Sequence, residues 1–265
     1  MNWQRYNELV ALGDSGRIEE SIAGFFGLCV ANEDPLSRAV VLMAIANGLR
    51  QLKRVADARH KIAEACELLG PKHEYYPRAA FQAALLDMDD ENWKGALKKL
   101  DDILEKYETV LRTEDHRDLL EEVQRRRGMA LTELERFREA RPVLESLRLV
   151  EYDRAATLCY LGVCDFELKD HDAAMEVYDE LLALDSDSVF RAYANYHKGA
   201  ILFQRGQLAR AKSEFEQCLA CPDRGDIPVE NLVELLVDTC KGLNLTGDVA
   251  RYAELLKKVR SGMAP

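Results

Sequence analysis

The sequence lacks any uninterrupted apolar run near the ~18 residues that a membrane-spanning helix needs. Its first eight residues also lack the basic segment, apolar core and small-residue cleavage site of a secretory signal. We therefore expect neither a membrane span nor a signal peptide.

Positive charge is scarce relative to negative charge. The chain has 36 Lys and Arg against 47 Asp and Glu, for a formal net charge of −11 at pH 7. A field of this sign repels the phosphates of nucleic acids and anionic membrane surfaces. We expect no nucleic-acid partner and no membrane partner, because either would need a local basic patch.

Catalytic motifs are missing as well. The sequence has no glycine-rich phosphate loop, no Gly-x-Ser-x-Gly elbow and no His-Glu-x-x-His metal motif. Cys218 and Cys221 form a lone Cys-x-x-Cys without a second pair of ligands, and the nearest histidine in sequence is His197. We expect Cys218 to pack in the core, and we expect no enzyme, catalytic residue, metal site or cofactor.

The seven cysteines are an odd number scattered through the chain. This distribution is typical of reduced thiols rather than of a disulfide framework. It predicts a cytoplasmic protein.

The sequence does contain an internal repeat. Gly162 is followed by Ala174 and Tyr178, and the next segment repeats this order with Gly199, Ala211 and Phe215. Two helices approach closely only where each presents a small residue, and a bulky residue one turn later fills the adjoining gap. The pattern therefore indicates consecutive helical hairpins.

These segments resemble the tetratricopeptide repeat, a 34-residue unit with small residues at positions 8 and 20 and a large apolar residue at position 24. Seven candidate units begin at Asn2, Ala39, Pro77, Glu121, Ala155, Ala192 and Val233. Position 8 is occupied in order by Leu9, Ala46, Ala84, Gly128, Gly162, Gly199 and Cys240. Position 20 is occupied by Ser21, Ala58, Ala96, Ala140, Ala174, Ala211 and Tyr252, and position 24 by Phe25, Ile62, Leu100, Leu144, Tyr178, Phe215 and Leu256.

The resemblance implies an all-α fold. We expect one domain over residues 1–265, a right-handed superhelical α-solenoid of about seven hairpins and fourteen helices. Two segments exceed the repeat length. Residues 111–120 are expected to begin the fourth unit's first helix early, with Thr113 or Asp115 as N-cap. Residues 226–232, which contain Pro228, are expected to form a loop and then the start of a helix.

In this family the first helix of each unit lines a concave groove, chiefly at positions 2, 5, 9, 12 and 13 and often at position 6. Aromatic residues and arginine dominate binding energy at protein interfaces, and both are frequent at these positions here. The resemblance therefore predicts a groove that binds a protein or peptide, although packing between first helices is the alternative. The candidate binding residues are Asn47, Arg78, Phe81, Gln82, Arg125, Arg126, Tyr160, Tyr193 and Tyr196.

Three of these residues, Arg78, Arg125 and Arg126, form a basic cluster in an acidic chain. A guanidinium group suits carboxylates, so the cluster favours an acidic segment of a partner. The alternative is that the arginines pair with carboxylates of the chain itself, at Glu121, Glu122 or Glu133.

The favoured function is a protein-interaction scaffold or adaptor that binds a partner peptide or helix in the groove. One alternative is a peptide-sensing regulatory domain that acts in trans. Another is self-association through the terminal units, at Trp3 and Tyr6 or at Leu255, Leu256 and Val259.

Overall fold

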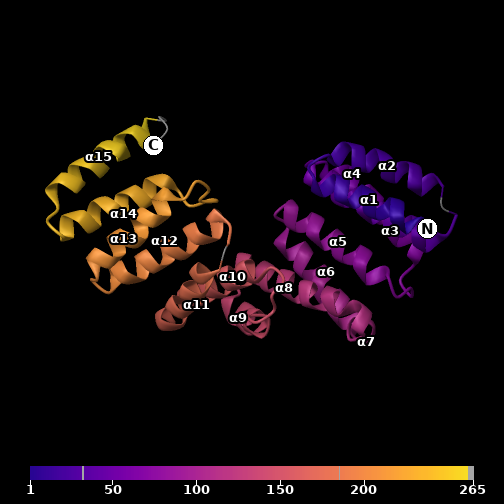
Figure 1. Cartoon of the computed structure of the whole chain (residues 1–265). Helices are drawn as coiled ribbons and strands as arrows, with labels where there is room; N and C mark the ends of the chain where they lie inside the picture. The colour runs from indigo at the N-terminus through magenta and orange to yellow at the C-terminus, as the bar shows by residue number, and fades with distance from the viewer. Residues whose placement is uncertain (32, 185, 262–265) are drawn as a thin grey trace. The chain divides into compact units, whose positions relative to one another are not determined.

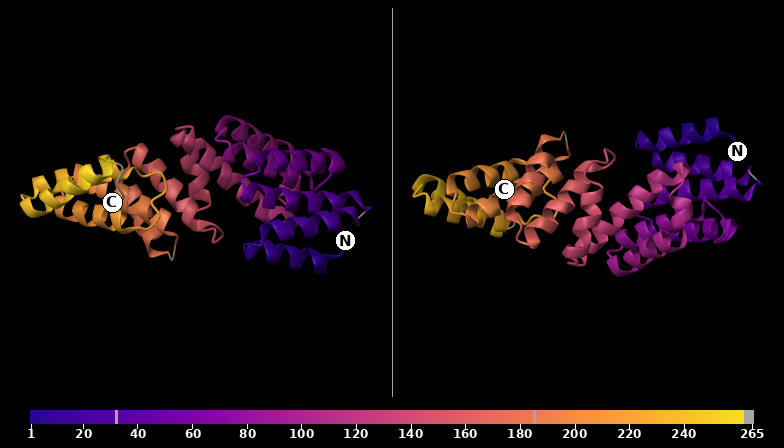
Figure 2. Two further views of the ribbon diagram at one scale, coloured as in Figure 1. Left: turned by 90° about the horizontal axis from the view of Figure 1, so that it is seen from above. Right: turned by 90° about the horizontal axis from the view of Figure 1, so that it is seen from below.

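The computed structural model describes residues 1–31, 33–184 and 186–261. Contacts within the chain cluster into two units, Met1–Glu135 and Arg136–Pro265, and each is described by itself. Figure 1 shows that both consist of helices, and Figure 2 shows the helices of each unit following one another in chain order. That the whole chain is a single domain stays a prediction.

Unit 1 contains three hairpins and one further long helix. The hairpins are α1 (Trp3–Asp14) with α2 (Ile18–Val30), α3 (Pro35–Gln51) with α4 (Val55–Leu69), and α5 (Tyr76–Asp89) with α6 (Trp93–Lys106). The short α7 (Glu108–Leu111) and the 3-10 helix η1 (Glu114–His116) precede α8 (Arg117–Glu133). Neighbouring hairpins meet where α2 packs on α3, α4 on α5 and α6 on α8.

Unit 2 begins with α9 (Phe137–Ser146), which packs on the next helix, α10. Three hairpins follow: α10 (Arg154–Glu167) with α11 (His171–Ala183), α12 (Ser188–Gln204) with α13 (Leu208–Ala220), and α14 (Val229–Gly242) with α15 (Thr246–Arg260). The predicted all-α architecture of about seven sequential hairpins is confirmed. None of the described helices has both the length and the apolarity needed to cross a membrane.

The turns inside the hairpins agree with the predicted register in six units. In each of them a residue with positive φ lies seven residues after position 8, namely Gly16, Lys53, Glu91, Glu135, Lys169 and Gly206. In the last unit the corresponding residue is Asn244, with φ 57°, only four residues after Cys240. If the turn residue again lies seven residues after position 8, position 8 of this unit is Val237 and the unit begins at Glu230, three residues earlier than predicted. Positions 20 and 24 are then Val249 and Ala253.

Position 8 shows why the helices of a hairpin pack closely. A Cβ atom at Gly199 would lie 2.5 Å from Cε1 of Phe215, so the ring leaves no space for a side chain. In the first unit the large Leu9 stands at this position, and Gly24 of α2 provides the space, because a Cβ there would overlap the Leu9 side chain. The hydroxyl of Ser21 also donates a hydrogen bond to the Leu9 carbonyl at 2.7 Å.

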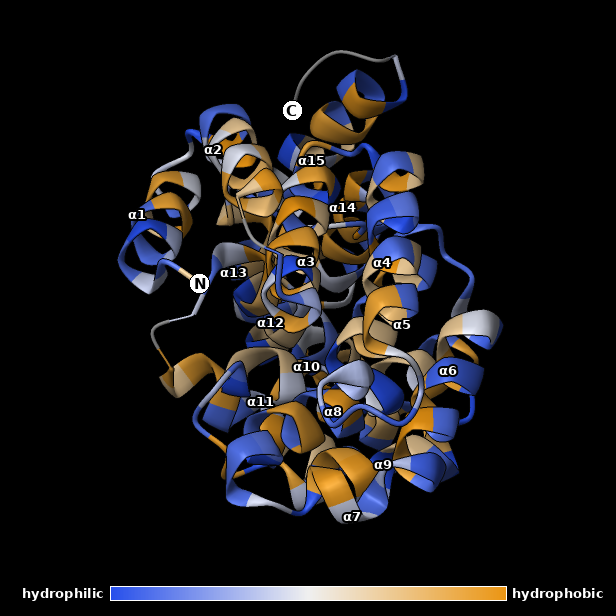
Figure 3. Ribbon diagram, turned by 90° about the vertical axis from the view of Figure 1, so that its right-hand side faces the viewer, coloured by the Kyte–Doolittle hydropathy of each residue, from blue (hydrophilic) through white to orange (hydrophobic). Residues whose placement is uncertain are grey.

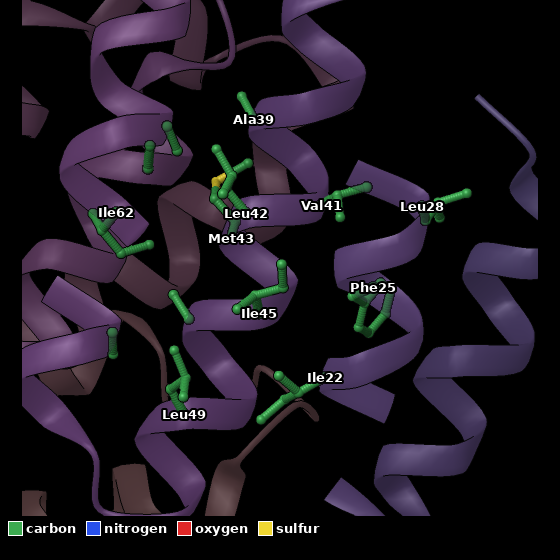
Figure 4. Close-up of a cluster of buried hydrophobic side chains, with 14 of the residues drawn as sticks. Ile22, Phe25, Leu28, Ala39, Val41, Leu42, Met43, Ile45, Leu49 and Ile62 are labelled. Atoms are coloured by element: carbon green, nitrogen blue, oxygen red, sulfur yellow. The ribbon is translucent and has the colours of Figure 1, made fainter. Parts of the chain in front are cut away.

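The apolar faces of the helices form the core. Figure 3 shows that most helices have an apolar side and a polar side. In unit 1 the side chains of Phe25, Ile45 and Ile62, from α2, α3 and α4, are almost fully buried in one cluster (Figure 4). Apolar burial between neighbouring repeats contributes to the folding free energy of such an array, together with the stability of each repeat.

Ion pairs also join neighbouring repeats at recurring positions. Arg59 and Arg141, both at position 21, reach the buried carboxylates of Asp87 at 2.7 Å and Asp165 at 2.5 Å, both at position 11 of the next repeat. Burial raises the pKa of Asp165 despite its bond from Arg141. Burial acts on Asp87 in the same direction, but the bonds from Lys99 and Arg59 hold its pKa below the ordinary value.

The predictions for the two segments that exceed the repeat length agree with the structure to different extents. Helix α8 does begin before Glu121, at Arg117, but its N-cap residue is His116. Thr113 is the N-cap residue of η1, which directly precedes α8, and its side chain makes no capping hydrogen bond there. The Thr113 hydroxyl instead donates to the Val110 carbonyl at 2.7 Å. The predicted loop before α14 is confirmed, since that helix begins directly after Pro228.

Candidate interaction surface

We define the first-helix face as the side chains at positions 2, 5, 6, 9, 12 and 13 of each unit's first helix. Six of the nine predicted binding residues fall in unit 1. Asn47 on α3 is exposed and Gln82 on α5 is half-buried, whereas Phe81 is only 8% exposed and packs in the core. Phe81 therefore offers little surface to a partner, contrary to its prediction as a groove residue.

The three predicted arginines of unit 1 are held by carboxylates of the chain. Arg78 donates to both oxygens of Asp118 at 3.0 and 2.9 Å, and these bonds lower the pKa of Asp118. Arg126 donates to Glu122 at 2.9 Å, and Arg125 pairs with the same carboxylate.

Arg125 is also fully buried, at 0% exposure, which differs from its prediction as an accessible groove residue. The alternative interpretation, pairing within the chain, is confirmed at Glu122 for two of the three arginines. The basic cluster therefore gives little support to an acidic partner.

The other three predicted residues, Tyr160, Tyr193 and Tyr196, lie on α10 and α12 of unit 2 and are half-buried. Tyr193 and Tyr196 contact the ring of His197, with centroid distances of 6.4 and 5.4 Å. Phe166 reaches the same imidazole at 4.8 Å. The structure thus gathers half-exposed aromatic side chains from two first helices around one histidine.

His197 stays neutral at the centre of this cluster. Burial lowers the pKa of His197 to about 4, so the ring carries no charge at neutral pH. Within the described part of the chain its Nδ1 atom has no hydrogen-bond partner. The ring of Tyr178 stacks on it, with centroids 5.6 Å apart. The Tyr178 hydroxyl is buried without a partner among the described residues.

A segment between α13 and α14, residues 222–228, lies against the first-helix face of unit 2, and we call it the strap. Its Asp223 backbone N–H donates to the Ser188 hydroxyl at the start of α12, at 3.2 Å. A Cβ at Gly225 would lie 2.9 Å from Val189 and 3.1 Å from the Tyr193 ring. The length surplus in the sequence marked this segment, but it gave no sign that the segment covers Tyr193.

A separate hollow of about 630 Å³ lies on unit 1, away from the first-helix face. Lys61 holds its ammonium 5.7 Å from the centroid of the Phe26 ring there. The charged side chains of the lining are balanced, two acidic and two basic, so the hollow favours neither sign of ligand. Its lining residues are Phe26, Cys29, Val30, Glu33, Arg38, Leu42, Lys61 and Glu64.

The cysteine pair is divided between the core and the surface. Cys218 is fully buried, as predicted, and burial raises the pKa of its thiol to about 12, whereas Cys221 is half-buried. Over residues 1–31, 33–184 and 186–261, no group of three or more His, Cys, Asp or Glu is arranged to hold a metal ion.

Comparisons with known proteins agree with the repeat. Tetratricopeptide-repeat family models match residues 157–188 and 192–220. No curated protein sequence matches the chain significantly.

Solved structures with similar folds share little sequence with the chain. The apo form of the quorum sensor NprR from B. thuringiensis has a TM-score of 0.75 and 14% identity, over 96% of this chain and 74% of that chain. The apo form of RapI has a TM-score of 0.67 and 15% identity, over 98% and 97% of the two chains. YrrB, described as a TPR protein with an unusual peptide-binding site, has a TM-score of 0.54 and 17% identity, over 75% and 92%.

At such low identities the structural likeness shows the fold alone. The sequential hairpins, the turn that recurs seven residues after position 8, and the two family matches all point to the same repeat. The chain is a tetratricopeptide-repeat protein.

Proposed function

We propose that this chain is a non-catalytic, cytoplasmic scaffold that binds a peptide or helix of another protein on the first-helix face of unit 2. Tetratricopeptide-repeat proteins are generally protein-interaction scaffolds. The observation that carries the proposal is the group of half-buried aromatic side chains, Phe166, Tyr193 and Tyr196, around His197. Such side chains provide large, rigid contact area, which makes them frequent binding hot spots.

The affinity of a captured partner for a Tyr193→Ser variant tests the proposal. Affinity capture from lysate, with mass spectrometry, supplies the partner, and calorimetry with the purified partner measures its dissociation constant. Loss of a hot-spot tyrosine costs about 2 kcal/mol or more, so binding is expected to weaken roughly thirtyfold.

Tyr152→Ser is the matched control, because Tyr152 is 70% exposed and lies in the loop before α10, outside the first-helix face. The control is expected to bind like the wild type. A folded Tyr193→Ser variant with wild-type affinity would contradict the proposed site.

The peptide-sensing alternative uses the same surface but predicts a different response. The similarity of the fold to those of the quorum sensor NprR and of YrrB supports this alternative. A sensor changes its own conformational equilibrium on binding, whereas a scaffold binds with little change. Small-angle scattering with and without the captured peptide separates the two.

Self-association through the terminal units remains a further prediction. Trp3 is 57% exposed and contacts Tyr6 edge-on, with ring centroids 5.7 Å apart. Sedimentation at two protein concentrations tests it directly.

A further inference from the structure

The strap brings negative charge to the aromatic surface of unit 2. It is held at one end by the bond from Asp223 to Ser188 and at the other by Ile227, which is 7% exposed in the core. Gly225, with φ +59°, lies between them against Val189 and Tyr193. These contacts hold the backbone of the strap, which carries Asp223 and Asp226, against α12.

The charge of Asp226 acts on a residue of α10. Burial and, as a smaller effect, the negative charge of Asp226 raise the pKa of the Cys159 thiol on α10 to about 12. Cys159 is at position 5 of α10, so the negative field of Asp226 extends to the first-helix face. Asp226 itself is exposed to solvent.

The strap carboxylates lie apart from the ion pairs that join the helices of unit 2. Among the residues that the structure describes, no Lys or Arg forms an ion pair with Asp223 or Asp226. Arg224, the cation between them in sequence, is turned away, because its Nη1 donates to the carbonyls of Leu219 and Cys221 at 3.0 and 2.6 Å. Asp223 instead accepts the backbone N–H of Gly225 at 2.9 Å.

The carboxylates on α14, in contrast, form ion pairs with Lys or Arg. Glu230 pairs with Arg260 at 2.7 Å, Glu234 pairs with the same guanidinium, and Asp238 pairs with Lys241 at 2.9 Å. The two strap carboxylates therefore differ from those of α14, since no ion pair joins them to a described residue. In unit 1 the arginines of the first-helix face are already paired with carboxylates of the chain.

The aromatic cluster adds two features that suit a cation. Lys169 already places its ammonium 5.4 Å from the centroid of the Phe166 ring, which shows that the cluster accommodates a positive charge at its edge. His197, in contact with both Phe166 and Tyr193, is neutral at neutral pH, and its buried Nδ1 lacks a partner among the described residues.

We infer that the strap makes this surface selective for a basic peptide. A Lys or Arg side chain of the partner sits against the Tyr193 ring and pairs with Asp226, with Asp223 adding to the negative field. The inference rests on the proposed function, since it specifies the ligand of the same surface. The charge of this basic peptide is opposite to that of the acidic partner segment that Arg78, Arg125 and Arg126 favoured in the sequence.

A random dodecapeptide library displayed on phage, selected against the full chain, tests this inference. The selected peptides are expected to be enriched in Lys and Arg. Replacing the key basic residue of the best peptide by Gln should weaken binding to the wild-type chain at least about tenfold, the lower end for a charge-assisted contact. The double variant Asp223→Asn with Asp226→Asn should bind the peptide and its Gln analogue equally.

Two further variants make the experiment specific. Gly225→Val keeps both charges but displaces the strap, because its side chain meets Val189 and Tyr193, and it should reduce the preference for the basic peptide. Asp238→Asn removes a carboxylate that already pairs with Lys241 and should leave the preference unchanged. Thermal unfolding of each variant checks that it is folded.

The outcomes separate the two proposals. Peptides selected without basic enrichment, or a double variant that still discriminates against the Gln analogue, would overturn the basic-ligand inference while leaving peptide binding intact. Failure to select any peptide, or selected peptides that bind Tyr193→Ser as tightly as the wild type, would overturn both.

Discussion

Gly162 lies against the ring of Tyr178 so closely that a Cβ atom would fall 2.7 Å from Cζ and 2.9 Å from Cδ1. The small residue at position 8 of this hairpin therefore faces the large residue at position 24. Tyr178 is fully buried, so other side chains surround its ring.

The variant Gly162→Ala is expected to destabilise the protein by about 1–3 kcal/mol through overpacking, even though alanine is the better helix former. Gly27→Ala is the matched control, because a Cβ there meets nothing within 4 Å. This control should gain about 0.5–1 kcal/mol from helix propensity alone. Urea unfolding measures both, and equal effects of the two changes would contradict the packing.

Tyr178→Phe removes a hydroxyl that is buried without a partner among the described residues. Since an unsatisfied buried polar group costs about 1–3 kcal/mol, this variant should be as stable as the wild type or more stable. Tyr107→Phe should instead lose about 0.5–1.5 kcal/mol, because the Tyr107 hydroxyl donates to the Pro71 carbonyl at 2.9 Å. A Tyr178→Phe variant with a lower midpoint of thermal unfolding would show that the hydroxyl has a partner.

His197 should make stability depend on pH. The unfolded chain protonates this residue below its ordinary pKa of about 6.5, whereas burial delays protonation in the folded chain to about pH 4. Between these values the unfolded state binds more protons, so the free energy of unfolding falls as the pH falls, by on the order of 3 kcal/mol. The contribution is complete above pH 6.5.

Urea unfolding from pH 7 to pH 4 checks this. His197→Phe should have a shallower pH dependence, and His60→Gln, at an exposed site, should follow the wild type. Identical slopes for wild type and His197→Phe would refute the pKa shift.

The Arg141 and Asp165 pair should show strong coupling. Arg141→Met alone leaves a buried carboxylate without its ion-pair partner and is expected to cost about 3–5 kcal/mol. Adding Asp165→Leu should recover most of this loss, because the next junction has Met175 and Leu202 at the same positions. A double-mutant cycle should give at least about 1 kcal/mol of coupling.

The exposed pair Arg54 and Asp57 provides the comparison, with side chains 59% and 54% exposed. Its coupling is expected to be below about 1 kcal/mol. Equal coupling in the two pairs would mean that burial of Asp165 does not matter.

The sequence predicted most of the fold because small and large residues recur at fixed positions in the second to the sixth units. It misplaced the last unit by three residues for a physical reason. Residues three apart lie on the same side of a helix, so Cys240 and Val237 offer similar small side chains to the partner helix. Only the turn, at Asn244, distinguishes the two registers.

The candidate site was harder to predict. The repeat position indicates on which side of a helix Arg125 lies, but it does not indicate whether other groups bury it. Glu122, three and four residues before Arg125 and Arg126, was the available sign of local pairing.

The sequence also contains a sign of the buried Arg–Asp ion pairs between repeats. Position 11 is leucine in the first, second, fourth and sixth units, but it is aspartate at Asp87 and Asp165. The preceding unit has arginine at position 21 in those two cases, at Arg59 and Arg141. The sequence contains no such sign of the contacts between the strap and α12. These contacts join a loop to a helix, and the repeat pattern describes only contacts between helices.

Hydrogen exchange with mass spectrometry, with and without a bound peptide, tests the central claim most directly. Because a ligand lowers the population of open states where it binds, its footprint appears as slower exchange. We expect slower exchange in α10, α12 and the strap of unit 2, with α11 and α13 unchanged. Protection confined to α11 and α13, or to unit 1, would contradict binding on the first-helix face of unit 2.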